Sequence, residues 1–228
     1  MSESVRVLST LALKGAVSTL AGRYAAAGGV RTDADFAPTL ALLDRLRAGE
    51  AADVVILTRE GLDEVVREGR VTAASCVDLA RSYVGLAVRS GEPHPDISTE
   101  PALRAALLGA RAVAYSRLGA SGILFAKLIE RLGIASEING RAVVIPQGFT
   151  AERLVAGEAD LAVQQISELK QVSGIEVIGP IPHPLQTPAV FSAGRMTASP
   201  RAAQSDRLLR YLASTEAAPA LRESGLEA

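Results

Sequence analysis

The sequence predicts an α/β protein of two lobes, each a mainly parallel β-sheet flanked by helices, joined by two crossing strands. Short runs of Val, Ile and Leu alternate with longer helical patterns, as expected for parallel strands with crossover helices. The alternation forms two series, and two β-prone segments, residues 83–89 and 188–193, lie at their junctions. A chain needs two crossings to leave one lobe, build another and return. Lobe one is therefore expected to hold residues 1–82 and 189–228, and lobe two residues 83–188.

Each series supplies three strands, and a helix follows each strand. In the first series we expect strands at residues 5–8, 30–36 and 54–57 and helices at residues 13–27, 39–48 and 60–68. In the second series we expect strands at residues 112–115, 142–145 and 161–163 and helices at residues 121–132, 150–156 and 166–170. Arg and Leu at helical spacing predict two more amphipathic helices, over residues 201–214 and on to Glu223.

Composition disfavours several classes of function. Among 228 residues, 24 Lys and Arg balance 25 Asp and Glu, so no strong field attracts nucleic acid or an anionic membrane, and neither is an expected partner. A single cysteine, Cys76, excludes an internal disulfide and a cysteine-rich metal site. His94 and His183 lack metal-ligand spacing. No nucleotide-binding glycine motif and no Gly-x-Ser-x-Gly elbow occurs, so we expect no metal and no cofactor.

The N-terminus bears on location. Met1-Ser2-Glu3 is followed almost at once by a strand pattern, without a basic segment and an apolar segment of the length that a signal peptide has. The sequence as written therefore predicts a cytoplasmic protein. A periplasmic location would require that a leader had been removed, and only then would a transporter be an expected partner.

Five turns that follow predicted strands carry small or polar residues. In open parallel sheets, ligands bind beyond the carboxyl ends of the strands, here in the expected cleft between the lobes. The turns are Ser9-Thr10-Leu11-Ala12, Pro38-Thr39, Gly119-Ala120-Ser121-Gly122, Gln147-Gly148-Phe149-Thr150 and Gln164-Gln165-Ile166-Ser167. Helix N-termini attract anions through free N–H groups and their partial positive charge. These turns therefore predict a site for a small anion that needs no arginine.

Each of these residues also has an ordinary structural interpretation. Ser121 and Thr150 are good N-cap residues. Gln165 ends an apolar strand, where its buried amide needs partners that either a ligand or backbone carbonyls can supply. Lys14 lies in the first turn of a helix, where a cation is disfavoured, so it is either a solvated surface residue or an anion contact.

Four blocks of sequence carry a resemblance to a known family. They are residues 7–16, residues 39–56 with Gly49-Glu50-Ala51-Ala52-Asp53, residues 120–127, and Gly157-Glu158-Ala159-Asp160-Leu161-Ala162-Val163-Gln164-Gln165-Ile166-Ser167-Glu168-Leu169. The chain resembles, over nearly its whole length, the molybdate-binding-protein-like branch of the type II periplasmic binding proteins. The resemblance implies the two-lobe fold of that superfamily and an oxyanion held by hydroxyls and main-chain amides at the same turns.

Positions matched to that family give the expected ligand set. Ala12 stands where the family usually has its first serine, Thr39 at the second, Ser121 in the third turn, Gln147 in the fourth, and Gln165 in place of a tyrosine. With neighbouring turn residues, the expected ligand-binding residues are Ser9, Thr10, Ala12, Thr39, Tyr115, Ser121, Gln147, Gly148 and Gln165. The departures point away from molybdate and tungstate, towards a carboxylate or another oxyanion.

Three functions are compatible with this pattern. The leading hypothesis is a binding protein for a small oxyanion or carboxylate. The alternative is a cofactor-independent isomerase, because proteins similar to this chain in the same superfamily include aconitate isomerase, which moves a proton along a tricarboxylate. Lys14 is then the candidate catalytic acid or base, with Tyr115 or His183 as the second group. A ligand-sensing domain of a regulator comes third, because no helix-turn-helix pattern is present.

Overall fold

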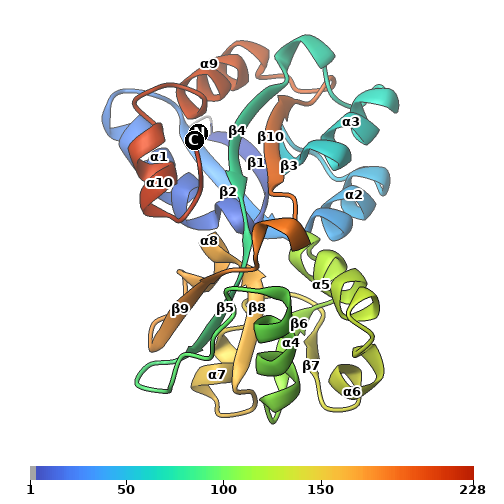
Figure 1. Ribbon diagram of the computed structural model, residues 1–228. Helices are drawn as coiled ribbons and strands as arrows, with labels where there is room; N and C mark the ends of the chain where they lie inside the picture. Colours follow the sequence, from blue (N-terminus) through green and yellow to red (C-terminus); the bar gives the residue numbers. More distant parts are fainter. Residues whose placement is uncertain (1–3) are drawn as a thin grey trace. The chain divides into compact units, whose positions relative to one another are not determined.

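The computed structural model describes residues 4–228. Met1 to Glu3, which contributed to the predicted cytoplasmic location, lie outside the described residues. The described chain divides into two compact units, one made of the residues up to Ser82 with Ala189–Ala228, the other of Tyr83–Pro188. Each unit contains one five-stranded sheet with helices packed on it (Figure 1). The predicted α/β class with mainly parallel sheets is confirmed.

The first unit is built on the strand order β2-β1-β3-β10-β4. Central strand β1 pairs in parallel with both β2 and β3, whereas β10 runs antiparallel to β3 and β4. The strands are β1 (Ser4–Thr10), β2 (Arg31–Ala37), β3 (Val54–Thr58), β4 (Val77–Ser82) and β10 (Ala189–Arg195). The helices are α1 (Lys14–Ala26), α2 (Thr39–Arg47), α3 (Arg59–Arg67), α9 (Ala202–Leu212) and α10 (Ala218–Glu223), with 3₁₀ turns at Leu11–Leu13 and Ala73–Ser75.

Apolar residues on both faces of this sheet explain its helix layers. Adjacent side chains of a strand point to opposite faces. Val7 accordingly packs in a core with α1, α9 and α10, and Leu8 packs in a second core with α2 and α3. The continuous apolar run of β3, Val54–Thr58, is fully buried because both of its faces are covered.

The second unit repeats the plan with the order β7-β6-β8-β5-β9. Central strand β6 pairs in parallel with β7 and β8, and β5 runs antiparallel to β8 and β9. The strands are β5 (Val84–Arg89), β6 (Val113–Ser116), β7 (Val143–Ile145), β8 (Leu161–Gln165) and β9 (Ile175–Pro180). The helices are α4 (Glu100–Gly109), α5 (Ala120–Arg131), α6 (Ala135–Asn139), α7 (Glu152–Val155) and α8 (Ile166–Leu169), with a 3₁₀ turn at His183–Leu185.

The two faces of the second sheet differ in side-chain size. Val113 and Tyr115 of β6 pack with Phe125 and other large residues of α4, α5 and α6. Ala114 lies on the opposite face with Ala162 and Leu154, under α7 and α8. Small residues on this face bring the short helices α7 and α8 close to the sheet.

Some elements differ from the expectation. The sequence analysis did not predict β4, α4, α6 and β9. The apolar pattern of β4 is interrupted by Asp78 and Arg81, and β9 ends in Gly179-Pro180, residues that are uncommon inside strands. The first expected crossing segment, residues 83–89, contains β5 of the second sheet, and the preceding strand β4 of the first sheet ends at Ser82. Across residues 4–228, no helix has both the length and the apolar character needed to cross a bilayer.

Candidate functional site

The turn after β6 contains a buried hydroxyl that lacks a partner. Ser116 ends β6, its side chain is buried, and its Oγ makes no hydrogen bond to any described residue. Two glycines flank this hydroxyl: a Cβ atom built on Gly119 or on Gly122 would lie 2.9 Å from Ser116 Oγ. At Gly122 the Cβ would also lie 1.7 Å from the Ser116 carbonyl oxygen, so only glycine allows helix α5 to approach the strand this closely.

Helix α5 starts at this turn without a side-chain cap. Gly119 is its N-cap residue, no side chain accepts a hydrogen bond there, and no acidic residue lies in the first turn. The first intrahelical bond runs from Ile123 N–H to the Gly119 carbonyl, 3.1 Å, which leaves the preceding N–H groups of the helix without intrahelical acceptors. Ser121 is 1% exposed, and no described residue bonds its hydroxyl. An anion placed here would satisfy the N–H groups and both serine hydroxyls.

Arg117 lies in the same turn and was missed in the sequence analysis. Its backbone N–H donates to the Ile145 carbonyl at 3.0 Å, which extends the β6–β7 ladder and fixes the turn. Its side chain is exposed and forms no ion pair or hydrogen bond with the part of the chain that the structure describes. Arg117 precedes the N-cap residue Gly119 by two positions, so the turn carries a positive charge that suits a carboxylate.

The Gln164 amide ties the end of strand β8 to the turn after β7. Its oxygen accepts from Thr150 N at 2.8 Å and from Thr150 Oγ1 at 3.1 Å, and its nitrogen donates to the Gly148 carbonyl at 2.9 Å. Gly148 has φ of +92°, which favours glycine. Gln147 is exposed, and its side chain has no partner among the described residues. Thus Gln164 holds the turn and Gln147 is available to a ligand.

Gln165 has a structural role at the start of α8, and ligand contact by this residue stays a prediction. It is the N-cap of α8 in a reciprocal capping box: its side chain accepts from the Glu168 backbone N–H, and Gln165 N donates to Glu168 Oε2 at 3.3 Å. A ligand is therefore not needed to satisfy the Gln165 amide oxygen. Burial raises the pKa of the Glu168 carboxyl to about 8, against the opposing effect of hydrogen bonds from the Gln165 backbone and the Gln164 side chain.

Tyr115 lies in the core of the second unit. Its ring is buried in the helix-facing core, 5.1 Å from Phe125 between ring centroids, and its hydroxyl donates to Asn139 Oδ1 at 2.7 Å. The alternation of side chains along β6 puts Tyr115 on the same face as Val113, so it points into the core under α5 and α6. Tyr115 is therefore a packing residue.

His183 lies beyond the end of β9. It starts a 3₁₀ turn and packs edge to face with Tyr83, 5.1 Å between ring centroids. The register pairs Gly85 with Pro180 and Val84 with Gln165, so β9 and β8 end at the same edge of the sheet. His183 therefore lies at the edge that carries the ligand turns of the second unit.

In the first unit, the turn after β1 is satisfied internally. Thr10 Oγ1 accepts from Ala12 N at 3.4 Å and caps the 3₁₀ turn, and Ser9 Oγ donates to the Thr10 carbonyl at 3.1 Å. The methyl group of Ala12 is buried in the core. Lys14 is the exposed first residue of α1, with no acidic residue in the first turn. Its placement agrees with the predicted helix start.

Thr39 is the first-unit residue best placed for a ligand. It begins α2 with its side chain buried, and its hydroxyl has no hydrogen bond to the described residues. Thr58, not identified from sequence, caps α3 by accepting from Gly61 N at 3.3 Å. A Cβ at Gly61 would lie 2.8 Å from Thr39 Cγ2 and 3.3 Å from Thr58 Oγ1, so the starts of α2 and α3 come together at Gly61.

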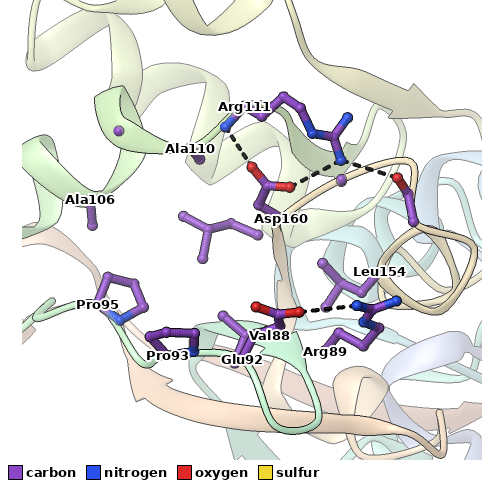
Figure 2. A pocket seen from close by; sticks show the side chains of 14 residues that line it. Val88, Arg89, Glu92, Pro93, Pro95, Ala106, Ala110, Arg111, Leu154 and Asp160 are labelled. Atoms are coloured by element: carbon purple, nitrogen blue, oxygen red, sulfur yellow. Dashed lines mark hydrogen bonds and ion pairs between the residues drawn. The ribbon is translucent and has the colours of Figure 1, made fainter.

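A pocket of the second unit lies away from these turns. It has a volume of about 570 Å³, and Val88 is among its lining residues (Figure 2). Leu161, the first residue of β8, also lines it, so the pocket lies at the opposite edge of the sheet from the ligand turns. Its arginines are already paired, Arg111 with Asp160 at 3.0 Å and Arg89 with Glu92 at 3.0 Å. An anion would have to displace these carboxylates. Within the described residues, no cluster of three or more His, Cys, Asp or Glu side chains could hold a metal ion.

Comparison with known proteins agrees with the two-sheet α/β fold described above. The family described as bacterial extracellular solute-binding protein matches residues 5–227. An aconitate isomerase from Pseudomonas sp is 36% identical over 98% of this chain and 87% of its own length. The periplasmic molybdate-binding protein of Azotobacter vinelandii has a TM-score of 0.84 at 16% identity, covering 99% of each chain. The sulfate-binding protein of Mycobacterium tuberculosis has a TM-score of 0.78 at 16% identity, covering 98% of this chain and 86% of the other.

Proposed function

Because the chain belongs to the family of bacterial extracellular solute-binding proteins, we propose that it binds a small anion, a carboxylate or another oxyanion, at the turns that follow its parallel strands. One observation carries the proposal: the buried hydroxyl of Ser116, at the uncapped N-terminus of α5, has no hydrogen-bond partner among residues 4–228. A buried hydroxyl without a hydrogen bond costs free energy, and a bound oxyanion removes that cost. The free N–H groups of α5 supply donors for the remaining oxygens of the ligand.

The charge of the turn favours a carboxylate over a tetrahedral oxyanion. Tetrahedral oxyanions can be held by neutral donors alone, whereas Arg117 adds a guanidinium, whose fork of donors matches the two oxygens of a carboxylate. Exposed Gln147 adds a neutral donor at the neighbouring turn. We therefore expect di- or tricarboxylates to bind better than sulfate or molybdate.

A thermal-unfolding screen tests this proposal. The purified protein is heated with molybdate, tungstate, sulfate, phosphate, cis-aconitate, trans-aconitate and other di- and tricarboxylates. A ligand present at a hundred times its dissociation constant stabilises the folded state by about 2.7 kcal/mol. Stabilisation by polycarboxylates supports the proposal, and the absence of stabilisation by every anion contradicts it.

Isomerisation of an unsaturated polycarboxylate is the second candidate. The 36% identity with an aconitate isomerase over nearly the whole chain favours it. The reaction removes a proton from a carbon next to a carboxylate, shifts the double bond by one position, and returns a proton to the far carbon. It needs one base and one acid but no oxidant. We propose Lys14 of the first unit and His183 of the second, each taken by itself, as candidate proton carriers, since the Tyr115 hydroxyl already donates to Asn139.

Proton exchange with solvent tests for turnover. The protein is incubated with cis- or trans-aconitate in D₂O, and deuterium incorporation is followed by NMR. Incorporation that disappears in Lys14→Met or in His183→Gln supports isomerisation with that residue as a proton carrier. A protein that binds aconitate but exchanges no proton is a binding protein only.

The two candidates also differ in location and partner. A solute receptor would be exported and would deliver its ligand to a membrane transporter, whereas an isomerase of a metabolite would work in the cytoplasm. Cell fractionation of the source organism distinguishes them. Recovery from the periplasm favours the receptor, and recovery from the cytoplasm favours the enzyme.

A further inference from the structure

The pocket at the other edge of the second unit's sheet takes no part in the proposed anion binding. Its volume of about 570 Å³ lies within the range of small-molecule sites, about 300–1,000 Å³. Its apolar lining comes from both cores of the unit and is buried; the residues are Val88, Leu154, Ala159 and Leu161. An apolar group bound here would therefore extend both cores and leave water.

Four charged side chains line the same pocket, two of each sign, so their charges sum to zero. Arg111 pairs with Asp160 at 3.0 Å, and Arg89 pairs with Glu92 at 3.0 Å. The two pairs lie on opposite sides of the pocket (Figure 2). All four side chains are exposed, and exposed ion pairs contribute little to stability, so either pair can share its charges with a ligand.

This charge pattern favours a ligand that carries both charges. An anion alone would draw an arginine away from its carboxylate, and a cation alone would draw a carboxylate away from its arginine. A zwitterion that lies between the two pairs gives every charge an opposite neighbour, since its ammonium faces a carboxylate and its carboxylate faces a guanidinium. Together with the apolar lining, this is the pattern that an amino acid with an apolar side chain matches.

The first unit shows an aspartate in the same role with one more donor. Asp53 precedes β3 as Asp160 precedes β8, and its carboxylate accepts from Arg6 N at 2.9 Å, as that of Asp160 accepts from Arg111 N at 2.6 Å. Ser199 Oγ also donates to Asp53 at 2.7 Å, and Asp53 is 2% exposed. The Asp160 side chain is 42% exposed. The position that the chain itself fills at Asp53 is therefore open to a ligand at Asp160.

Hydrogen bonds hold both sides of the pocket before a ligand binds. The bond from Arg111 N fixes the Asp160 carboxylate. On the other side, Glu176 of β9 accepts from Gly91 N at 3.0 Å, which fixes the turn that carries Glu92. Groups that are held in this way lose less conformational entropy when a ligand binds.

We propose that this pocket is a second binding site, for an amino acid that is zwitterionic and has an apolar side chain. The ammonium of the ligand binds Asp160, at the position that Ser199 fills beside Asp53. Its carboxylate binds Arg89, and its side chain packs on the apolar lining. The site does not depend on the proposed function, because it lies at the opposite edge of the sheet from the start of α5.

Four probes that share a phenylethyl skeleton test the charge pattern. L-phenylalanine carries both charges, 3-phenylpropionate only the negative charge, 2-phenylethylamine only the positive charge, and 3-phenylpropanamide neither. The probes are titrated into the ¹⁵N-labelled full chain, and the amide shifts of Gly109 and Gly157, which line the pocket, are followed by NMR. We expect L-phenylalanine to bind at least about tenfold more tightly than each of the other three.

Two results of this titration would overturn the proposal. Equal affinity for L-phenylalanine and any of the other probes would show that the ion pairs do not select a zwitterion. Shifts at Ser121 and Gly122 in place of Gly109 and Gly157 would put the amino acid at the start of α5.

Variants of the two ligand contacts separate charge recognition from the shape of the pocket. Arg89→Gln and Asp160→Asn each remove one charge, and Asp160→Asn keeps an oxygen that accepts from Arg111 N. Each should weaken L-phenylalanine binding about tenfold and leave the affinity for 3-phenylpropanamide within about twofold. Arg131→Gln is the matched control, since Arg131 is an exposed arginine of α5 outside the pocket, and it should keep the wild-type affinities. Equal losses for both probes in Arg89→Gln and Asp160→Asn would overturn the proposed contacts.

Discussion

The close approach of α5 to Ser116 can be tested with a single methyl group. In Gly122→Ala, the added Cβ would lie 1.7 Å from the Ser116 carbonyl oxygen and 2.6 Å from its carbon. Both atoms belong to the backbone of a central strand, so the helix must move away by more than an ångström. Overpacking of this kind costs about 1–3 kcal/mol. The usual gain from replacing a helical glycine by alanine, about 0.5–1 kcal/mol, is too small to compensate.

Gly22→Ala provides a matched control. Gly22 is also helical, in α1, and a Cβ there meets nothing within 4 Å. This variant should be stabilised by about 0.5–1 kcal/mol, whereas Gly122→Ala should be destabilised by about 2 kcal/mol. Urea unfolding with a common slope measures both values. Gly122→Ala as stable as wild type, with unchanged anion affinity, would refute the close packing of α5 on Ser116.

Three further predictions follow from the described contacts. Burial raises the pKa of Glu168 from 4.5 to about 8 in the folded protein, so the wild type should lose on the order of 4 kcal/mol of folding stability between pH 5 and pH 9. Glu168→Gln lacks this titration and should therefore become more stable than wild type over that range. Urea unfolding that shows the same pH dependence for both proteins would contradict this prediction. Tyr115→Phe removes the hydrogen bond to Asn139, so its free energy of unfolding, measured by thermal unfolding, should fall by about 1 kcal/mol. Its anion affinity, measured by calorimetry, should stay the same. A large loss of affinity would show that Tyr115 contacts the ligand. Arg117→Ala should weaken tricarboxylate binding more than sulfate binding in the same titrations, and equal losses would argue against carboxylate selection by this residue.

The order of strands and helices was readable from the sequence because burial on both sheet faces leaves long apolar runs. The run Val54–Thr58 is an example, and its position between helical patterns predicts a parallel strand. β9 was missed because half-buried residues alternate with a glutamate and end in Gly-Pro. α4 was missed because its first turn contains Pro101, although proline is common at that helix position.

The candidate site was only partly predictable, for reasons visible at single residues. Ser116 was overlooked because its importance depends on the contact with Gly119 and Gly122, which no local pattern reveals. Strand alternation places Tyr115 with Val113 in the core, a position that was readable from the sequence. The capping role of Gln165 was readable from Glu168 three residues later, the spacing of a capping box.

Calorimetric titration and urea unfolding of Ser116→Ala test the central claim most directly. Removing a buried hydroxyl without a partner leaves the free protein as stable as wild type or more stable, because no hydrogen bond is lost. The bound anion loses a hydrogen bond to a charged group, worth about 1.5–3 kcal/mol, so its affinity should fall about 10- to 100-fold. Unchanged affinity for the anion that stabilises the wild type most would show that the ligand does not bind at the start of α5.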